Sequence, residues 1–231
     1  MIDFFIGSTY FGVVLTIVAY LVGLVIKKKL KFAIFNPMLI AIVLIIVVLI
    51  TLKIPYDTYF NSTTMINYLL TPSTICLAVP LYEKVEVLKG NLKAILIGIF
   101  SGVITCMISV FLVGKIFSLS NEEFATFLPK SLTTAIGMAI SEELNGIVAI
   151  SVAVIMITGI TGSIISDLVF KVFNIHEPVA KGLALGTASH VIGTVKATEY
   201  GKIESAVSSL SIAVTGLLTV IVAPIVAKIY F

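Results

Sequence analysis

The sequence predicts an all-α, polytopic membrane protein with about seven or eight transmembrane helices, some of them broken or re-entrant. Composition is the first reason: of the 231 residues, 59% are hydrophobic and only 12% are charged. A soluble domain usually carries about a quarter charged residues, so a water-soluble fold could not hide this much apolar surface. Pattern is the second reason, because apolar runs alternate with short polar loops that carry lysine.

Eight apolar runs follow one another along the chain. They cover residues 9–26, 38–52, 65–82, 94–117, 127–140, 146–173, 179–196 and 205–230. A helix needs about 20 apolar residues to cross a bilayer. The fifth and seventh runs are short and interrupted, so re-entrant segments are an alternative to full spans there.

We interpret residues 1–231 as a single integral membrane domain. Within it, residues 9–60 are expected to form N-terminal scaffold spans, and residues 65–231 a core with broken helices near 71–80, 129–142 and 182–196. Lysines gather in the loops after the first and third runs, which places the N-terminus outside by the positive-inside rule. The N-terminus lacks the basic region and cleavage site of a signal peptide, so the first run is interpreted as a retained span.

Several classes of function are disfavoured. The net charge of +3 is spread over loops and forms no basic stripe, which argues against nucleic acid as a partner. Cys76 and Cys106 lie in apolar stretches without metal-ligand spacing, so no metal or other cofactor is expected. The sequence contains no GxSxG, P-loop or HExxH motif, and we predict that the protein is not an enzyme.

Prolines, glycines and small polar residues interrupt three of the apolar runs. The first interruption is LLTPSTICLAVPLY (69–82), where Pro72 and Pro80 bracket a short helical stretch. Thr71, Ser73 or Thr74 could cap a half-helix that starts here. The second is LPKSLTTAIGMAISEELNG (128–146), and the third is GLALGTASHVIGTVKATEYG (182–201). The second contains Ser131, Thr133, Thr134, Gly137, Glu142 and Glu143.

Broken helices at membrane depth leave unpaired backbone groups, which are tolerated only inside protein or beside a watery cavity. The N-terminus of a half-helix suits an anion, and secondary transporters build substrate sites in this way, often in repeated halves. A weak internal repeat sets STICLAVPL (73–81) against SLTTAIGMAI (131–140), and IFSG (99–102) against GITG (159–162). If all eight runs cross the membrane, the two copies of this repeat run in the same direction. The copies would be inverted only if one segment between them were re-entrant.

Residues 182–196 hold the candidates for the site. Small residues at helical spacing would let another helix approach closely. They are Gly182, Gly186, Ser189 and Gly193. His190 is a functional candidate because a histidine in a membrane segment is costly; the alternative is a neutral imidazole bonded to a neighbouring Ser or Thr. Thr187 and Thr194 lie on a similar helix face and could complete a polar pocket.

Charged residues near this segment have two interpretations each. Lys196 or Lys181 could neutralise a carboxylate substrate, or snorkel to the headgroups. Glu142 or Glu143 could carry a proton, pair with a lysine, or belong to a loop. Pro72, Pro80, Gly137, Gly186 and Gly193 are the expected backbone or hinge positions.

LTPSTICLAVPLYEK, LPKSLTTAIGMAISEELNG and AKGLALGTASHVIGTVKATEYG together resemble the LrgB/CidB family of bacterial membrane proteins, over nearly the whole chain. Such proteins are described as antiholin-like or autolysis-modulating, and are linked to murein hydrolase export. The resemblance implies a bacterial or archaeal cell membrane and a small holin-like partner of the LrgA/CidA type. Relatives are also linked to transport of pyruvate, glycolate and glycerate.

The first hypothesis is a secondary transporter of small monocarboxylates, with proton coupling through His190, Glu142 or Glu143. The substrate would bind Ser73, Thr74, Ser131, Thr133, Thr134, Thr187, Ser189, His190, Thr194 and Lys196. The alternative is a non-transporting antiholin-like regulator of the holin-like partner, which would expose its small-residue faces as interfaces. A homodimer in the lipid bilayer is expected in the first case.

Overall fold

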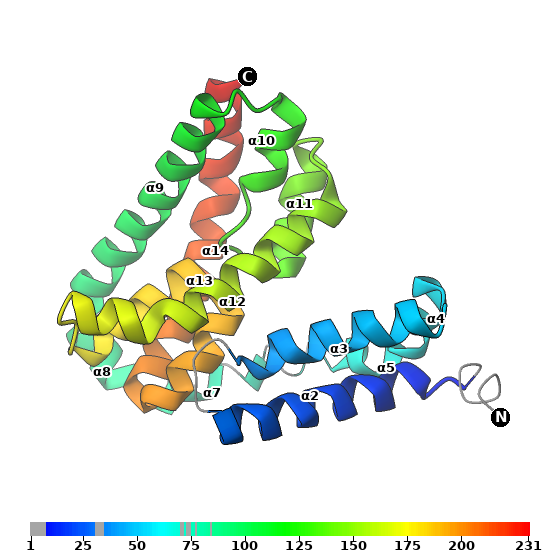
Figure 1. Cartoon of the computed structure of the whole chain (residues 1–231). Helices are drawn as coiled ribbons and strands as arrows, with labels where there is room; N and C mark the ends of the chain where they lie inside the picture. The colour runs from blue at the N-terminus through cyan, green and yellow to red at the C-terminus, as the bar shows by residue number, and fades with distance from the viewer. Residues whose placement is uncertain (1–7, 31–34, 70–71, 73–74, 77, 84) are drawn as a thin grey trace. The chain divides into compact units, whose positions relative to one another are not determined.

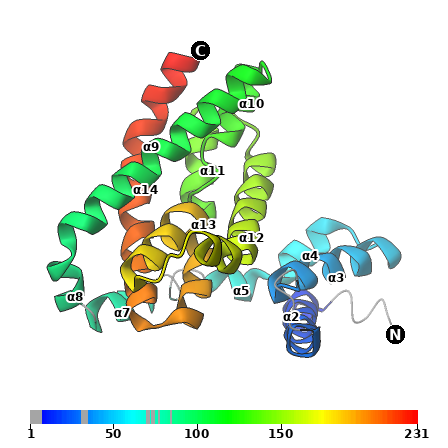
Figure 2. The same ribbon diagram turned by 60° about the vertical axis from the view of Figure 1, so that its left-hand side comes forward.

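The computed structural model describes residues 8–30, 35–69, 72, 75–76, 78–83 and 85–231, and the regular elements among them are helices (Figures 1 and 2). The predicted all-α class is confirmed. The chain forms two compact units, Met1–Cys76 and Leu77–Phe231. Each unit is described by itself.

Unit 1 is built on a close pair of consecutive helices, α2 (Phe11–Leu30) and α3 (Pro37–Thr51). They approach closely because Gly23 has no side chain: a Cβ there would lie 2.5 Å from the Pro37 carbonyl oxygen. Ala19 and Ala41 are buried in the same interface. Asn36 caps α3, its side chain accepting a hydrogen bond from the Met38 amide at 2.9 Å.

Two short helices, α4 (Tyr56–Ser62) and α5 (Thr64–Tyr68), complete unit 1. The Gly12 amide donates to Ser62 Oγ at 2.9 Å, and the Thr16 hydroxyl lies 2.8 Å from the Tyr59 hydroxyl. These bonds attach α4 to the first turns of α2.

The described residues of unit 2 form four helices of 23 residues or more and several shorter ones. In chain order they are α7 (Ala78–Glu83), α8 (Val85–Gly90), α9 (Leu92–Ile116), α10 (Asn121–Phe127), α11 (Thr134–Glu143), α12 (Val148–Val172), α13 (Pro178–Tyr200) and α14 (Lys202–Tyr230). In both views α9 and α14 run side by side, with α10 and α11 toward the C-terminal end of α14 and α13 toward its start.

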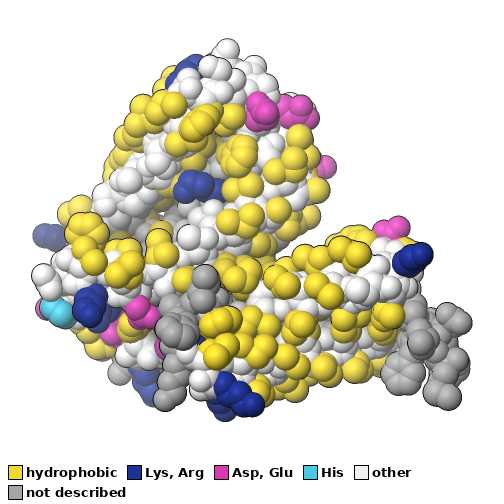
Figure 3. Space-filling model, viewed as in Figure 1, with side chains coloured by type: hydrophobic (Ala, Val, Ile, Leu, Met, Phe, Trp, Pro, Cys, Tyr) yellow, Lys and Arg dark blue, Asp and Glu magenta, His cyan; other side chains and the backbone are white. Residues whose placement is uncertain are grey.

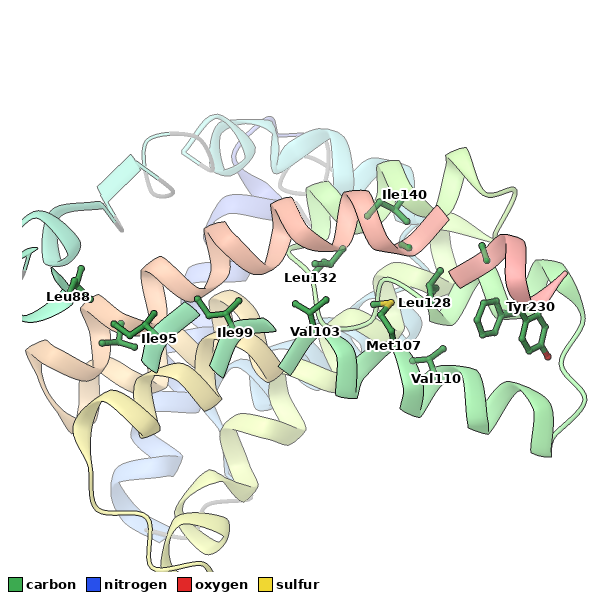
Figure 4. Close-up of a cluster of buried hydrophobic side chains, with 14 residues drawn as sticks. Leu88, Ile95, Ile99, Val103, Met107, Val110, Leu128, Leu132, Ile140 and Tyr230 are labelled. Carbon is green, nitrogen blue, oxygen red and sulfur yellow. The ribbon is translucent and has the colours of Figure 1, made fainter. Parts of the chain in front are cut away.

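The apolar core of unit 2 follows one face of α9. Its buried residues recur every three or four positions, which is the spacing of a single helix stripe. They are Ile95, Ile99, Val103, Met107, Val110 and Gly114. Leu128, Leu132 and Ile140 pack against this stripe from the α10–α11 region (Figure 4).

An aromatic cluster joins the C-terminal ends of α9 and α14 to α10. The Phe124 and Tyr230 rings stack with centroids 3.7 Å apart, and the Tyr230 hydroxyl donates to the Leu119 carbonyl at 2.8 Å. Lys115 donates to the Tyr230 carbonyl at 3.1 Å and lies over its ring. Glu123 forms a capping box with Ser120 at the start of α10.

In the described part of the chain, four helices, α2, α9, α12 and α14, are long and apolar enough to cross a membrane, and α3 is shorter at 15 residues. Many of their large apolar side chains are exposed, as expected for lipid-facing surfaces. Hydrophobic side chains cover much of the face in Figure 3, with charged ones mainly toward the helix ends. The predicted run 65–82 appears as short helices in its described parts, so the count of seven or eight spans and the internal repeat stay predictions.

Tyr230→Ala is expected to lower the free energy of unfolding by about 3–5 kcal/mol, because it removes a buried ring from the junction of three helices. Tyr230→Phe removes only the hydroxyl bond and should cost about 1 kcal/mol. Thermal unfolding of both variants in the same detergent gives the comparison. Equal effects would mean that the stacked ring contributes little.

Candidate functional site

Helix α13 is a hairpin that folds back on itself. The Lys181 ammonium lies 5.5 Å from the centre of the Tyr200 ring, although these residues are 19 positions apart. A continuous helix would separate them by about 28 Å. Likewise, a Cβ on Gly193 would collide with the carbonyl of Leu185, eight residues earlier. The two halves of α13 therefore lie against each other.

The reversal is at His190, whose backbone angles (φ 43°, ψ −133°) interrupt the helix. A positive φ is uncommon for a residue with a side chain and stores strain. The imidazole is 3% exposed, and Nε2 lies 2.9 Å from the Ile155 carbonyl oxygen of α12. Because a carbonyl only accepts, Nε2 carries the hydrogen and Nδ1 is the nitrogen left to take up a proton.

Glycines on the neighbouring helices make room for the tip of this hairpin. A Cβ on Gly159 would lie 2.6 Å from the His190 ring, and one on Gly162 would overlap the Ser189 hydroxyl. On α9, a Cβ at Gly102 would lie 3.2 Å from the Thr187 side chain. The tip thus sits between α12 and α9.

Helix α14 holds both halves of the hairpin. Thr194 donates to or accepts from Ser208 at 2.6 Å, and its hydroxyl also reaches the His190 carbonyl at 3.1 Å. Gly186 lies so close that a Cβ there would be 2.5 Å from the Ser208 carbonyl oxygen. Small residues on α13 therefore serve internal packing against α14.

Helices α10 and α11 form a second hairpin at the opposite end of unit 2. The Ile147 amide donates to the Thr126 hydroxyl at 2.8 Å, and Ser151 donates to the Thr126 carbonyl at 2.8 Å. Ser141 joins Ser151 at 2.7 Å. These bonds bring the end of α11 and the start of α12 back beside α10, so the segment enters and leaves at one end.

The turn of this second hairpin, residues 128–133, reaches the middle of α9. Cys106 Sγ lies 3.4 Å from Ser131 Oγ, and Lys130 Nζ lies 3.3 Å from the same oxygen. Thr133 is the N-cap of α11, but its side chain makes no capping hydrogen bond. Gly137 packs against Ile155 of α12.

The two tips meet at the same depth. Gly102, which contacts Thr187, and Cys106, which contacts Ser131, are one turn apart and flank the midpoint of α9. Ile155 of α12 meets both hairpins as well, through Gly137 and through His190. Two helix breaks therefore face each other in the centre of unit 2.

Comparison with known proteins fixes the family of this arrangement. The LrgB-like family model matches residues 16–229. The chain belongs to the LrgB-like family. The antiholin-like protein LrgB of Bacillus cereus (strain B4264) is 38% identical over 218 residues, which are 94% of this chain and 95% of that protein. The antiholin-like protein LrgB of Bacillus anthracis (strain A0248) gives the same values. No solved structure matches the chain.

The predicted resemblance is thereby confirmed, and this LrgB-like chain is a multi-pass membrane protein. The structure places ten of the predicted residues at or next to the two helix breaks. They are Ser131, Thr133, Thr134, Gly137, Gly186, Thr187, Ser189, His190, Gly193 and Thr194.

Other predicted residues lie elsewhere. Lys196 is at the open end of the α13 hairpin, paired with Asp167 at 3.2 Å and Glu199 at 2.8 Å. Glu142 and Glu143 are exposed at the end of α11. Ser73 and Thr74 lie outside the described residues. Pro72 is exposed, and Pro80 lies within α7.

Three residues near the tips carry no role in the sequence-based prediction. Ser208 forms a hydrogen bond with Thr194, and Lys130 lies in the turn of the second hairpin. The Thr215 hydroxyl of α14 is buried without a hydrogen-bond partner among the described residues. LPKS and the Ser/Thr spacing of α14 could have drawn attention to them. What singles these three residues out is their tertiary contacts, which the spacing of residues in the sequence does not reveal.

A cysteine scan tests the hairpin topology. In a background without Cys76 and Cys106, Ala180→Cys and Thr198→Cys should react with an impermeant maleimide from the same side of the membrane. Glu122→Cys should react from the opposite side. Labelling of residues 180 and 198 from opposite sides would show that α13 crosses the bilayer.

Gly186→Ala should destabilise the protein by about 1–3 kcal/mol, because the new methyl group forces α13 away from the α14 backbone. Gly90→Ala is the matched control, since a Cβ there meets nothing within 4 Å. Thermal unfolding in detergent compares the two. A Gly186→Ala variant as stable as Gly90→Ala would contradict the close contact.

Proposed function

We propose that this chain is a secondary transporter of small monocarboxylates such as pyruvate or glycolate. The observation that carries the proposal is the pair of re-entrant hairpins whose tips meet at the middle of α9. Interrupted backbone at membrane depth is stable only beside protein or a water-filled cavity. Broken helices meeting near the membrane midplane are a recurrent way to build a transporter's substrate site.

The order of elements supports an inverted repeat within the proposal. Residues 92–147 comprise a 25-residue helix followed by a hairpin, and residues 148–201 comprise another 25-residue helix followed by another hairpin. Because the first hairpin returns to its own end, α12 runs opposite to α9. The IFSG and GITG segments then fall within α9 and α12, and the re-entrant segment required for an inverted pair lies between them.

The chemistry of the tips favours an anion over a cation. The α11 N-terminus presents free amides and the positive end of its dipole, and lysine and histidine are the ionisable residues at the tips. His190 suits proton coupling, because Nε2 is engaged and Nδ1 is left to exchange the proton. The proposal leaves out Lys196, whose charge Asp167 and Glu199 already balance.

The printed names of the relatives favour a second candidate, an antiholin-like regulator acting on a holin-like membrane partner. Such a regulator would present its small-residue faces to another protein. Here Gly182, Gly186 and Gly193 are buried within unit 2, which supports the transporter. A homodimer and an extracellular N-terminus remain predictions.

Uptake of radiolabelled pyruvate into liposomes holding the purified protein tests the proposal. We expect saturable uptake that an inward proton gradient accelerates. His190→Asn, which tolerates a positive φ, should lose gradient-driven uptake at least tenfold. The other histidine, His176, is exposed, so His176→Asn serves as the matched control.

Two results would contradict the proposal in different ways. Full gradient-driven uptake by folded His190→Asn would remove His190 from proton coupling. If the wild-type protein takes up neither pyruvate, glycolate nor lactate, transport by this chain alone is refuted. Uptake that appears when a holin-like partner is added would then favour the second candidate.

A further inference from the structure

We infer that the Lys130 ammonium binds the carboxylate of the transported substrate, an inference that rests on the proposed function. The residue lies in the turn between α10 and α11, flanked by buried Leu128, Pro129, Ser131 and Leu132. Backbone bonds from the Lys130 amide to Phe127 and from the Leu132 amide to Pro129 fix this turn. The side chain is partly buried and is held at a defined place.

The ammonium lies far from the membrane surface. Its neighbour Ser131 contacts Cys106, ten residues before the end of α9, which is about 15 Å along the helix axis. Nζ remains 3.3 Å from the buried Ser131 hydroxyl. A snorkelling lysine would instead place its charge at the headgroups.

No counter-charge accompanies Lys130 among the described residues. Other lysines of unit 2 with restricted exposure have partners: Lys196 pairs with two carboxylates, and Lys181 lies over the Phe170 and Tyr200 rings. Lys130 has neither a carboxylate within 4.0 Å nor an aromatic ring beneath it in that part of the chain. A partly buried charge without an opposite charge beside it is costly at membrane depth, and an anionic ligand would offset the cost.

Further donors lie on the elements next to Lys130. The α11 N-terminus begins four residues after Lys130, and the Thr133 side chain is not used for capping. On α14, the buried Thr215 hydroxyl has no partner in the described structure, and adjacent Gly216 packs on Ile136 of α11. A carboxylate accepts from an ammonium, hydroxyls and helix-terminal amides together, so a small monoanion fits this set.

Charge removal at Lys130 is the direct experiment. Lys130→Gln should raise the KM for pyruvate uptake at least tenfold, and Lys130→Arg should retain more uptake than Lys130→Gln. Lys171→Gln removes an exposed lysine of α12 and should behave as wild type. An unchanged KM in folded Lys130→Gln, with active wild-type protein, overturns this inference and leaves the proposed function standing. Inactive wild-type protein overturns both.

A second measurement keeps Lys130 intact and does not depend on the folding of a variant. In a Cys76→Ser background, pyruvate should slow maleimide labelling of Cys106 several-fold, because the bound carboxylate would lie beside Ser131 and Lys130. The uncharged analogue pyruvamide should give no protection. If pyruvate at concentrations that saturate uptake does not slow the labelling of Cys106, the inference is overturned.

Discussion

The reversal of α13 at His190 is the constraint on which the centre of unit 2 depends. A helix that stops at membrane depth must have its freed polar groups covered by protein or water. Thr194 meets this requirement by donating to the His190 carbonyl, and the His190 ring anchors the break to α12 by bonding the Ile155 carbonyl. Glycines of α12 and α13 then follow from geometry, because any larger residue would hold the neighbouring helices away from the break.

Strain at the tip is consistent with a functional role for the break. A positive φ on histidine persists only where the surroundings impose it, and asparagine or glycine would adopt it at lower cost. The imidazole bonds the Ile155 carbonyl through Nε2, which any donor of the right length could do. The need for a group that can both bond a carbonyl and exchange a proton would give a reason for imidazole at this position.

The sequence predicted the membrane class and the broken segment at 182–196, because composition and helix breakers act locally; the break lies at His190, and the role of His190 stays a prediction. The sequence did not settle the topology of that segment. A 23-residue helix is long enough to cross a bilayer, and only tertiary contacts such as Lys181 with Tyr200 reveal the hairpin. The sequence also could not tell which lysines are paired with a carboxylate. Lys196 has two acidic partners in the structure, whereas Lys130 has none among the described residues.

Opposed hairpins also bear on how a site in the middle of the protein could open. Each tip is attached at one end of unit 2 only, the α13 tip through residues 178–200 and the second through residues 121–143. Displacing one hairpin would therefore expose the centre to one side while the other hairpin stayed closed. Ile155 of α12 lies against both tips, through Gly137 and His190. If the chain transports as proposed, alternating access requires two exclusive openings around one site, and one hairpin for each side would meet that requirement.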